Sequence, residues 1–204
     1  RLIRRQRQMC IRDRIKDYGN FKLEVESGEI YKGEVVSIVG PNGIGKTTFV
    51  KMLAGVEEPT EGKVEWELKV SYKPQYIKVD YEGTVYELLN KIDPAKLLSN
   101  FYKTELLNPL GLPDLYERKV DDLSGGELQK LAIGVTIIKD ADVYLFDEPS
   151  SYLDVSERMR IARIIRRLAE KNKKYVLVAE HDLAILDYIS DKITIYYGEP
   201  EAYG

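Results

Sequence analysis

The chain has 204 residues, of which 44% are hydrophobic and 32% are charged, and its formal net charge is −3 at pH 7. This composition is that of a globular protein with enough apolar residues for a core, and no apolar run reaches the roughly 18 to 20 residues of a membrane helix. The single cysteine, Cys10, excludes a disulfide framework, a cysteine zinc site and an iron–sulfur cluster within this chain. Because the charged N-terminus also lacks the apolar segment of a secretory signal, we expect a soluble, cytoplasmic protein.

The first 14 residues differ in composition from the rest. They contain six arginines and no lysine, whereas the remaining chain is rich in lysine and more acidic. A basic arm for nucleic acid is one interpretation. We favour a disordered or non-native leader at 1–14 and assign it no function, so that residues 15–204 form one domain.

Strands and helices alternate through the first half of the chain. Alternating apolar and polar residues at 21–30 predict a half-buried strand, and the short apolar run at 34–40 predicts a buried one. A helix is expected at 47–55, followed by two strands at 63–67 and 70–72.

The pattern becomes helical from Thr84, which we expect to cap a helix. After a loop at 111–122, strands and helices alternate again. The expected helices are 85–92, 95–107, 128–138 and 155 or 156 to about 171, and the expected strands are 143–146, 175–179 and 193–197. Such alternation predicts an α/β fold with a mostly parallel sheet covered by helices. The helical segment at about 83–140 would form an inserted lobe.

A glycine-rich motif, GPNGIGKT at Gly40–Thr47, lies between a predicted strand and a predicted helix, the context typical of a P-loop. Its backbone N–H groups can converge on phosphate oxygens, and the helix N-terminus favours the same negative charge. We expect Lys46 to reach the β- and γ-phosphates and Thr47 to offer its hydroxyl to Mg²⁺. The expected nucleotide-binding residues of this loop are Asn42, Gly43, Ile44, Gly45, Lys46, Thr47 and Thr48.

Two carboxylates follow the apolar strand VYLF. Asp147 comes at the carboxyl end of the strand, where parallel sheets place ligands, and is a candidate Mg²⁺ ligand. Glu148 is a candidate for the base that orients or deprotonates an attacking water. A solvated acidic turn is the alternative, and the nearby P-loop disfavours it.

Two further polar residues follow predicted strands. His181 is the only histidine, and its imidazole could hydrogen-bond a γ-phosphate. Gln75 could approach Mg²⁺ or the attacking water. Taken alone, a structural histidine and an ordinary loop glutamine remain open.

Together with LSGGELQ at Leu123–Gln129, these motifs resemble an ATP-binding-cassette (ABC) nucleotide-binding domain over about residues 21–195. This resemblance implies a P-loop NTPase fold with an antiparallel β edge and an inserted helical lobe. It also implies that the signature loop binds the nucleotide of a second domain, in trans. The signature residues are Ser124, Gly125, Gly126 and Glu127. Asp154 would join the two sites, and an upstream aromatic, Phe21 or Tyr18, would stack on adenine.

The segments SYKPQYI, LSGGELQK and DEPSSYLDVSER resemble more specifically the second nucleotide-binding domain of the E subfamily, the RNase L inhibitor family of soluble ribosome-splitting ATPases. Glu127 stands where transporter ATPases usually have glutamine. The resemblance implies Mg²⁺-dependent ATP hydrolysis coupled to closure and opening of two such domains. Because the chain has one P-loop, it would be a fragment of the full-length protein.

The implied partners are a second nucleotide-binding domain, expected in the same full-length chain, a ribosomal subunit and a release or rescue factor, with no membrane. One alternative is the ATPase subunit of a membrane transporter, in which the lobe at 83–140 would dock a membrane partner. A DNA-repair clamp is disfavoured, because about 47 residues between Gln75 and Leu123 are too few for long coiled coils.

Overall fold

The computed structural model describes residues 8–11, 14–17, 22–25, 28–41, 43–60 and 68–195, with side chains from Ile30 onward. Two candidate nucleotide contacts, Asn42 and Phe21, lie outside the described residues, as do the alternative aromatic Tyr18 and the strand expected at 63–67.

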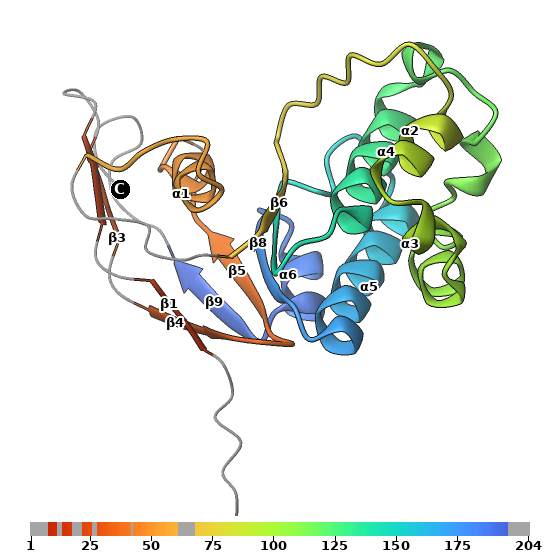
Figure 1. Ribbon diagram of the computed structural model, residues 1–204. Helices are drawn as coiled ribbons and strands as arrows, with labels where there is room; N and C mark the ends of the chain where they lie inside the picture. The colour runs from red at the N-terminus through yellow and green to blue at the C-terminus, as the bar shows by residue number, and fades with distance from the viewer. Residues whose placement is uncertain are drawn as a thin grey trace, which may run out of the picture.

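A five-stranded sheet forms the centre of the domain (Figure 1). Its order is β6-β7-β8-β5-β9, and every neighbouring pair is parallel. The strands are β5 (Val35–Val39), β6 (Val70–Lys73), β7 (Val143–Asp147), β8 (Tyr175–Ala179) and β9 (Lys192–Ile195). This confirms the predicted α/β class, because crossovers between parallel strands need the intervening helices.

Two antiparallel pairs form the β edge. Strand β1 (Gln8–Ile11) pairs with β4 (Gly28–Tyr31), and β2 (Arg14–Asp17) pairs with β3 (Lys22–Val25). The single strand predicted at 21–30 is therefore wrong. The alternation of apolar and polar residues ends at Glu26, and the prediction did not use Ser27 and Gly28 as a break between β3 and β4. Because β1 and the start of β2 fall within 1–14, part of the presumed leader pairs with later strands, while its origin stays a prediction.

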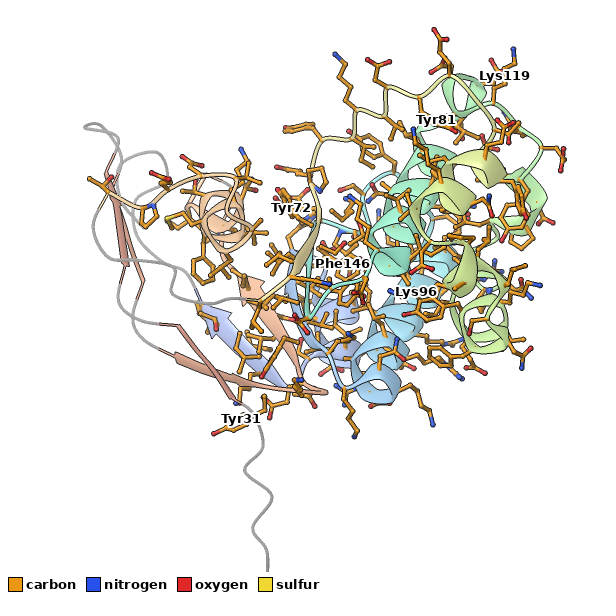
Figure 2. The ribbon with its side chains drawn as sticks, in the orientation of Figure 1. Tyr31, Tyr72, Tyr81, Lys96, Lys119 and Phe146 are labelled. Carbon is orange, nitrogen blue, oxygen red and sulfur yellow. The ribbon has the colours of Figure 1, made fainter. Side chains whose placement is uncertain are left out.

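Helices cover both faces of the sheet (Figure 1). One face carries α1 (Lys46–Leu53), whose side chains pack with Ile38 and Leu145. The other carries α4 (Gly125–Ile138) and α5 (Val155–Asn172), which pack with Phe146 (Figure 2) and with Val178. The remaining helices are α2 (Val85–Ile92), α3 (Pro94–Leu98), a π-helix at Tyr102–Leu107, 3₁₀ turns at Pro113–Leu115 and Val120–Asp122, and α6 (Leu183–Ile189).

Three helices begin with a capping box. Thr84, Ser124 and Asp154 each accept a hydrogen bond from the N–H of a glutamate three residues on, whose carboxylate accepts from the cap's own N–H. This cap explains why α4 begins at Gly125 and not at the predicted residue 128. The weak helix propensity of two glycines is outweighed by a satisfied first turn.

Two other helical predictions need correction. The helix expected over 95–107 is interrupted at Ser99, which has an extended backbone (φ −62°, ψ 130°), so that α3 and the π-helix are separate. The short α6 was not predicted, although Asp182 caps it by accepting from Ala184 N and Ile185 N. The lobe boundaries at 83 and 140 stay a prediction.

Candidate functional site

Four neighbouring strands end in predicted site residues. The P-loop follows β5, Gln75 follows β6, Asp147 ends β7 and His181 follows β8. Since β6, β7, β8 and β5 are consecutive and parallel, their carboxyl ends meet at one edge of the sheet. Segments far apart in sequence are thus brought together, as predicted.

The P-loop has the backbone that its glycines allow. Gly43 has φ 79° and Gly45, the N-cap of α1, has φ 101°, a region in which other residues are strained. Ile44 between them is buried and anchors the loop in the core below α1. The loop therefore presents backbone to a ligand while its one large apolar side chain points inward.

Lys46 lies beneath this loop. Its Nζ donates to the carbonyl oxygens of Gly40 at 2.5 Å and Pro41 at 2.7 Å. Burial lowers the pKa of Lys46, and the negative charges of Glu148 and Asp147 oppose that shift. The ammonium thus lies in an acidic site.

The candidate Mg²⁺ site consists of three side chains with oxygen atoms that could bind the metal: Thr47, Gln75 and Asp147. Thr47 Oγ1 donates to Gln75 Oε1 at 3.4 Å, which joins the P-loop to the loop after β6. Asp147 is buried, and burial raises its pKa, while its hydrogen bond with Thr47 lowers it. No group in the described part of the chain forms a well-aligned hydrogen bond with Asp147 Oδ2.

These atoms fit the cation. Mg²⁺ prefers oxygen ligands and is held in nucleotide sites by one or two protein oxygens together with substrate phosphates. The described residues contain no cluster of three or more His, Cys, Asp or Glu side chains that could hold a metal alone. A hydroxyl, an amide and one carboxylate with an unused oxygen match a site in which protein and substrate phosphates bind Mg²⁺ together.

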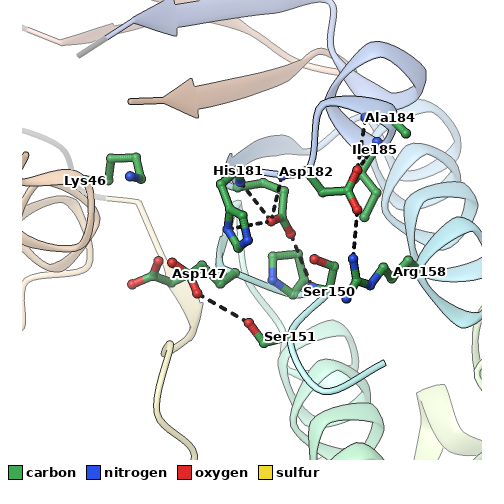
Figure 3. Close-up of polar contacts among 12 residues, drawn as sticks. Lys46, Asp147, Ser150, Ser151, Arg158, His181, Asp182, Ala184 and Ile185 are labelled. Atoms are coloured by element: carbon green, nitrogen blue, oxygen red, sulfur yellow. Dashed lines mark hydrogen bonds and ion pairs between the residues drawn. The ribbon is translucent and has the colours of Figure 1, made fainter. Parts of the chain in front are cut away.

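Glu148 has an unusual backbone. Its φ is 47°, which is left-handed and costs a residue with a side chain about 1 to 2 kcal/mol. Its N–H donates to the carbonyl of Ala179 at 2.8 Å, and Ser151 Oγ donates to its Oε2 at 3.3 Å (Figure 3). The Ala179 carbonyl thus holds the backbone of Glu148, and Ser151 contacts its carboxylate.

His181 is followed and preceded by charged residues that hold its turn. Its side chain is half exposed, and its Nδ1 lies 3.3 Å from Glu180 Oε1 (Figure 3). The fully buried Glu180 accepts from the N–H groups of His181, Asp182 and Ser150 at 2.8, 3.3 and 3.3 Å. Glu180 was missed from the sequence, although a glutamate directly after five buried strand residues is a signal.

Two other buried side chains were also missed. Lys73 at the end of β6 and Gln129 in α4 are both fully buried and contact the backbone around Glu148. Period-two alternation in β6 places Lys73 on the same buried face as Ser71, and this pattern could have identified it.

The signature residues lie away from the P-loop. Ser124 is exposed and caps α4, on the opposite face of the sheet from α1. Glu127 closes the capping box and pairs with Arg118 at 2.7 Å, and the backbone hydrogen bond from Ser124 lowers its pKa. The Ser124 and Gly125 backbone therefore faces outward.

Asp154 caps α5 in the turn that follows Glu148. It accepts from Glu157 N at 2.8 Å, which lowers its pKa. Arg158 connects this turn to the His181 turn, because it donates to Leu153 O at 2.9 Å and to Asp182 Oδ2 at 3.1 Å (Figure 3).

The described helices include none that is long and apolar enough to cross a membrane.

The family model described as "ABC transporter" matches residues 23–151. ABC transporter E family member 3 of Arabidopsis thaliana is 35% identical over 170 residues, which cover 80% of this chain and 94% of that protein. The chain belongs to the E family of ABC ATPases.

Two solved structures resemble this E-family domain along its length. One is the complex of archaeal ribosomal stalk protein aP1 and archaeal ribosome recycling factor aABCE1, with 64% identity and a TM-score of 0.94 over 100% of this chain and 40% of that one. The other is a model of ribosome-bound archaeal Pelota and ABCE1, with 68% identity and a TM-score of 0.92 over 95% and 32%. The chain spans only 30% to 32% of the length of the first curated relatives it matches.

Proposed function

We propose that this domain binds and hydrolyses ATP at the carboxyl edge of its sheet. The observation that carries the proposal is the convergence of Lys46, Asp147, Glu148 and His181 from three adjacent strand ends. Phosphoryl transfer to water requires four roles, and each residue has the chemistry for one of them. In the same order, these are a cation that binds the phosphates, a metal ligand, a base, and a hydrogen-bond donor to the γ-phosphate.

In this mechanism the P-loop N–H groups and Lys46 hold the β- and γ-phosphates. Glu148 orients the attacking water and accepts its proton, while His181 donates a hydrogen bond to the γ-phosphate. Thr47, Gln75 and Asp147 would hold Mg²⁺, which neutralises charge on the phosphates. Phe21 or Tyr18 remains our candidate for stacking on adenine, and Asn42 and Thr48 for further phosphate contacts.

We further propose that the site is completed by a second ABC domain, expected in the same full-length chain. Ser124 and Gly125 are exposed and Gly126 is partly exposed at a helix N-terminus, away from the P-loop of their own domain. A helix start with free N–H groups favours an anion, so this loop is suited to the γ-phosphate held by a partner. Asp154, in the turn after Glu148, would then lie between the two sites.

The cellular role that we propose is ATP-driven splitting of ribosomal subunits, with a release or rescue factor as partner. This role rests on the similarity to proteins whose descriptions name ribosome recycling and ribosome-bound Pelota. Membership of the E family favours it over the transporter ATPase alternative.

The Ser124→Arg variant of the native full-length protein tests this function. A bulky cation at the signature should leave ATP binding at Lys46 unchanged but prevent closure, so hydrolysis and splitting of purified ribosomes should both be lost. Ribosome splitting is measured by sucrose-gradient sedimentation with ATP. Splitting at the wild-type rate would contradict the trans arrangement, and no splitting by the wild type would contradict the ribosomal role.

A further inference from the structure

The backbone that carries Glu148 is held by two buried side chains. Lys73 Nζ donates to the carbonyl oxygens of Asp147 at 2.8 Å and Glu148 at 3.3 Å. Gln129 Nε2 donates to the carbonyl oxygens of Glu148 at 3.0 Å and Pro149 at 2.9 Å. Three successive carbonyls thus receive four hydrogen bonds from two residues, which we call the carbonyl clamp.

The two members of the clamp come from functionally placed segments. Lys73 ends β6, two residues before Gln75, and pairs in register with Phe146 of β7. Gln129 lies in α4, five residues after the signature cap Ser124. The clamp therefore joins the loop after β6 and the signature helix to the peptide of the candidate base.

Neither side chain is explained by packing alone. Lys73 is fully buried, and burying an ammonium is unfavourable unless it is paired and hydrogen-bonded. Burial lowers the pKa of Lys73 to about 8, and the charges of Asp147, Glu180 and Glu148 oppose this. Within the described residues, Gln129 Oε1 is buried without a hydrogen-bond partner, so the amide forms its hydrogen bonds through Nε2 alone.

The clamped peptide is itself strained. Glu148 has a left-handed backbone, and a strained conformation persists only where its surroundings over-determine it. The clamp fixes the carbonyl side of this peptide, whereas the hydrogen bond to Ala179 O fixes its N–H side. A peptide held on both sides cannot rotate without breaking several buried hydrogen bonds.

We propose that Lys73 and Gln129 are positioning residues that hold the Glu148 backbone in the conformation needed for hydrolysis. This inference rests on the proposed ATPase function. Neither residue needs to contact ATP, because both act through the carbonyls of Asp147, Glu148 and Pro149. Loss of either should therefore lower the rate of the chemical step and spare nucleotide affinity.

The test compares Lys73→Met and Gln129→Met with Ser71→Ala in the native full-length protein. Methionine has the length of glutamine, is one atom shorter than lysine, and removes the donors of both side chains. Ser71 is the matched control, because its buried Oγ also joins β6 to α4, by donating to Thr136 O at 2.7 Å, but it does not touch the clamped peptide. All variants are compared with the wild type for kcat, ATP affinity and thermal stability.

We expect kcat at this site, taken as the turnover above that of Lys46→Ala, to fall at least about tenfold in either clamp variant, since small misplacements of catalytic groups cost up to about 10²-fold. ATP affinity should stay within about threefold. The double variant should lose less than the product of the two single effects, because both residues hold one peptide. Ser71→Ala should lose stability but keep kcat within about twofold.

The clamp would be refuted if folded Lys73→Met and Gln129→Met proteins kept the wild-type kcat, or if Ser71→Ala lost as much kcat as they do. Gln129→Met alone decides the question if Lys73→Met does not fold. Wild-type hydrolysis with unaffected clamp variants would reject only the clamp, whereas absent wild-type hydrolysis would reject the ATPase function itself.

Discussion

Glu180 is expected to stabilise the fold through its two carboxylate oxygens. Oε1 accepts from the N–H groups of His181 and Asp182, and Oε2 accepts from Ser150 N, so that one buried side chain joins the turn after β8 to the turn after β7. Glu180→Gln preserves the size of the side chain and replaces one acceptor oxygen with an NH₂ group. The perturbation therefore keeps the packing but removes one hydrogen-bond acceptor together with the negative charge that faces Lys46 and Lys73.

The magnitude follows from the number of acceptors. A glutamine can keep its oxygen as the acceptor for the N–H groups of His181 and Asp182, because the bond from His181 is the shortest at 2.8 Å. Its NH₂ group must then face the N–H of Ser150, and both groups are donors. Ser150 is buried, and its N–H would lose its acceptor in a place that water does not reach. One unsatisfied buried donor costs about 1 to 3 kcal/mol. For a domain of this size, that corresponds to a decrease in Tm of roughly 2 to 12 °C.

Urea unfolding of the wild type and of Glu180→Gln measures this free energy directly, with an unchanged m-value expected. Glu170→Gln is the matched control, because Glu170 makes an exposed ion pair with Arg166 at 2.8 Å. Its loss should change stability by no more than about 0.5 kcal/mol. The reasoning is refuted if the two variants are equally stable.

Two other predictions concern the P-loop and the packing of α4. Lys46→Ala should weaken ATP binding about 10- to 100-fold in calorimetry, since it removes a charged donor worth about 1.5 to 3 kcal/mol; Lys51→Ala in the last turn of α1 is the control, and equal affinities would contradict the role of Lys46. Gly134→Ala should destabilise the fold by about 1 to 3 kcal/mol in urea, because its Cβ would lie 2.3 Å from Leu112 Cδ1. Gly125→Ala, whose Cβ would meet only Tyr152 at 4.0 Å, should not destabilise it, and a stable Gly134→Ala protein would show that this contact relaxes freely.

The parts of the fold that the sequence predicted are those with a strong local signal. Buried parallel strands such as β5 and β7 are short apolar runs, and Thr84 caps α2 as predicted. The start of α4 was placed too late, because the glycines of the signature have weak helix propensity and the cap at Ser124 was not used. The residues around Ser124 were sufficient to predict where α4 begins, but the prediction gave more weight to the weak helix propensity of the glycines than to the cap.

The site could be predicted as far as its residues follow strand ends. Gln75, Asp147 and His181 all lie where the parallel sheet brings them together. Glu180, Lys73 and Gln129 were missed because their roles depend on contacts between segments distant in sequence, such as Lys73 with Asp147 O. A buried lysine in a strand is visible only as an exception to apolar alternation, and its partners become evident only in three dimensions.

The central claim is that Glu148 promotes ATP hydrolysis at this sheet edge. The most direct measurement is steady-state ATP turnover by the native full-length protein with Glu148→Gln, beside ATP affinity measured by calorimetry. We predict that affinity stays within about threefold and that turnover at this site falls about 10²- to 10⁴-fold, the contribution of a general base. Because a second site could contribute its own turnover, the rate is compared with that of Lys46→Ala. Turnover by Glu148→Gln equal to the wild type would contradict the account.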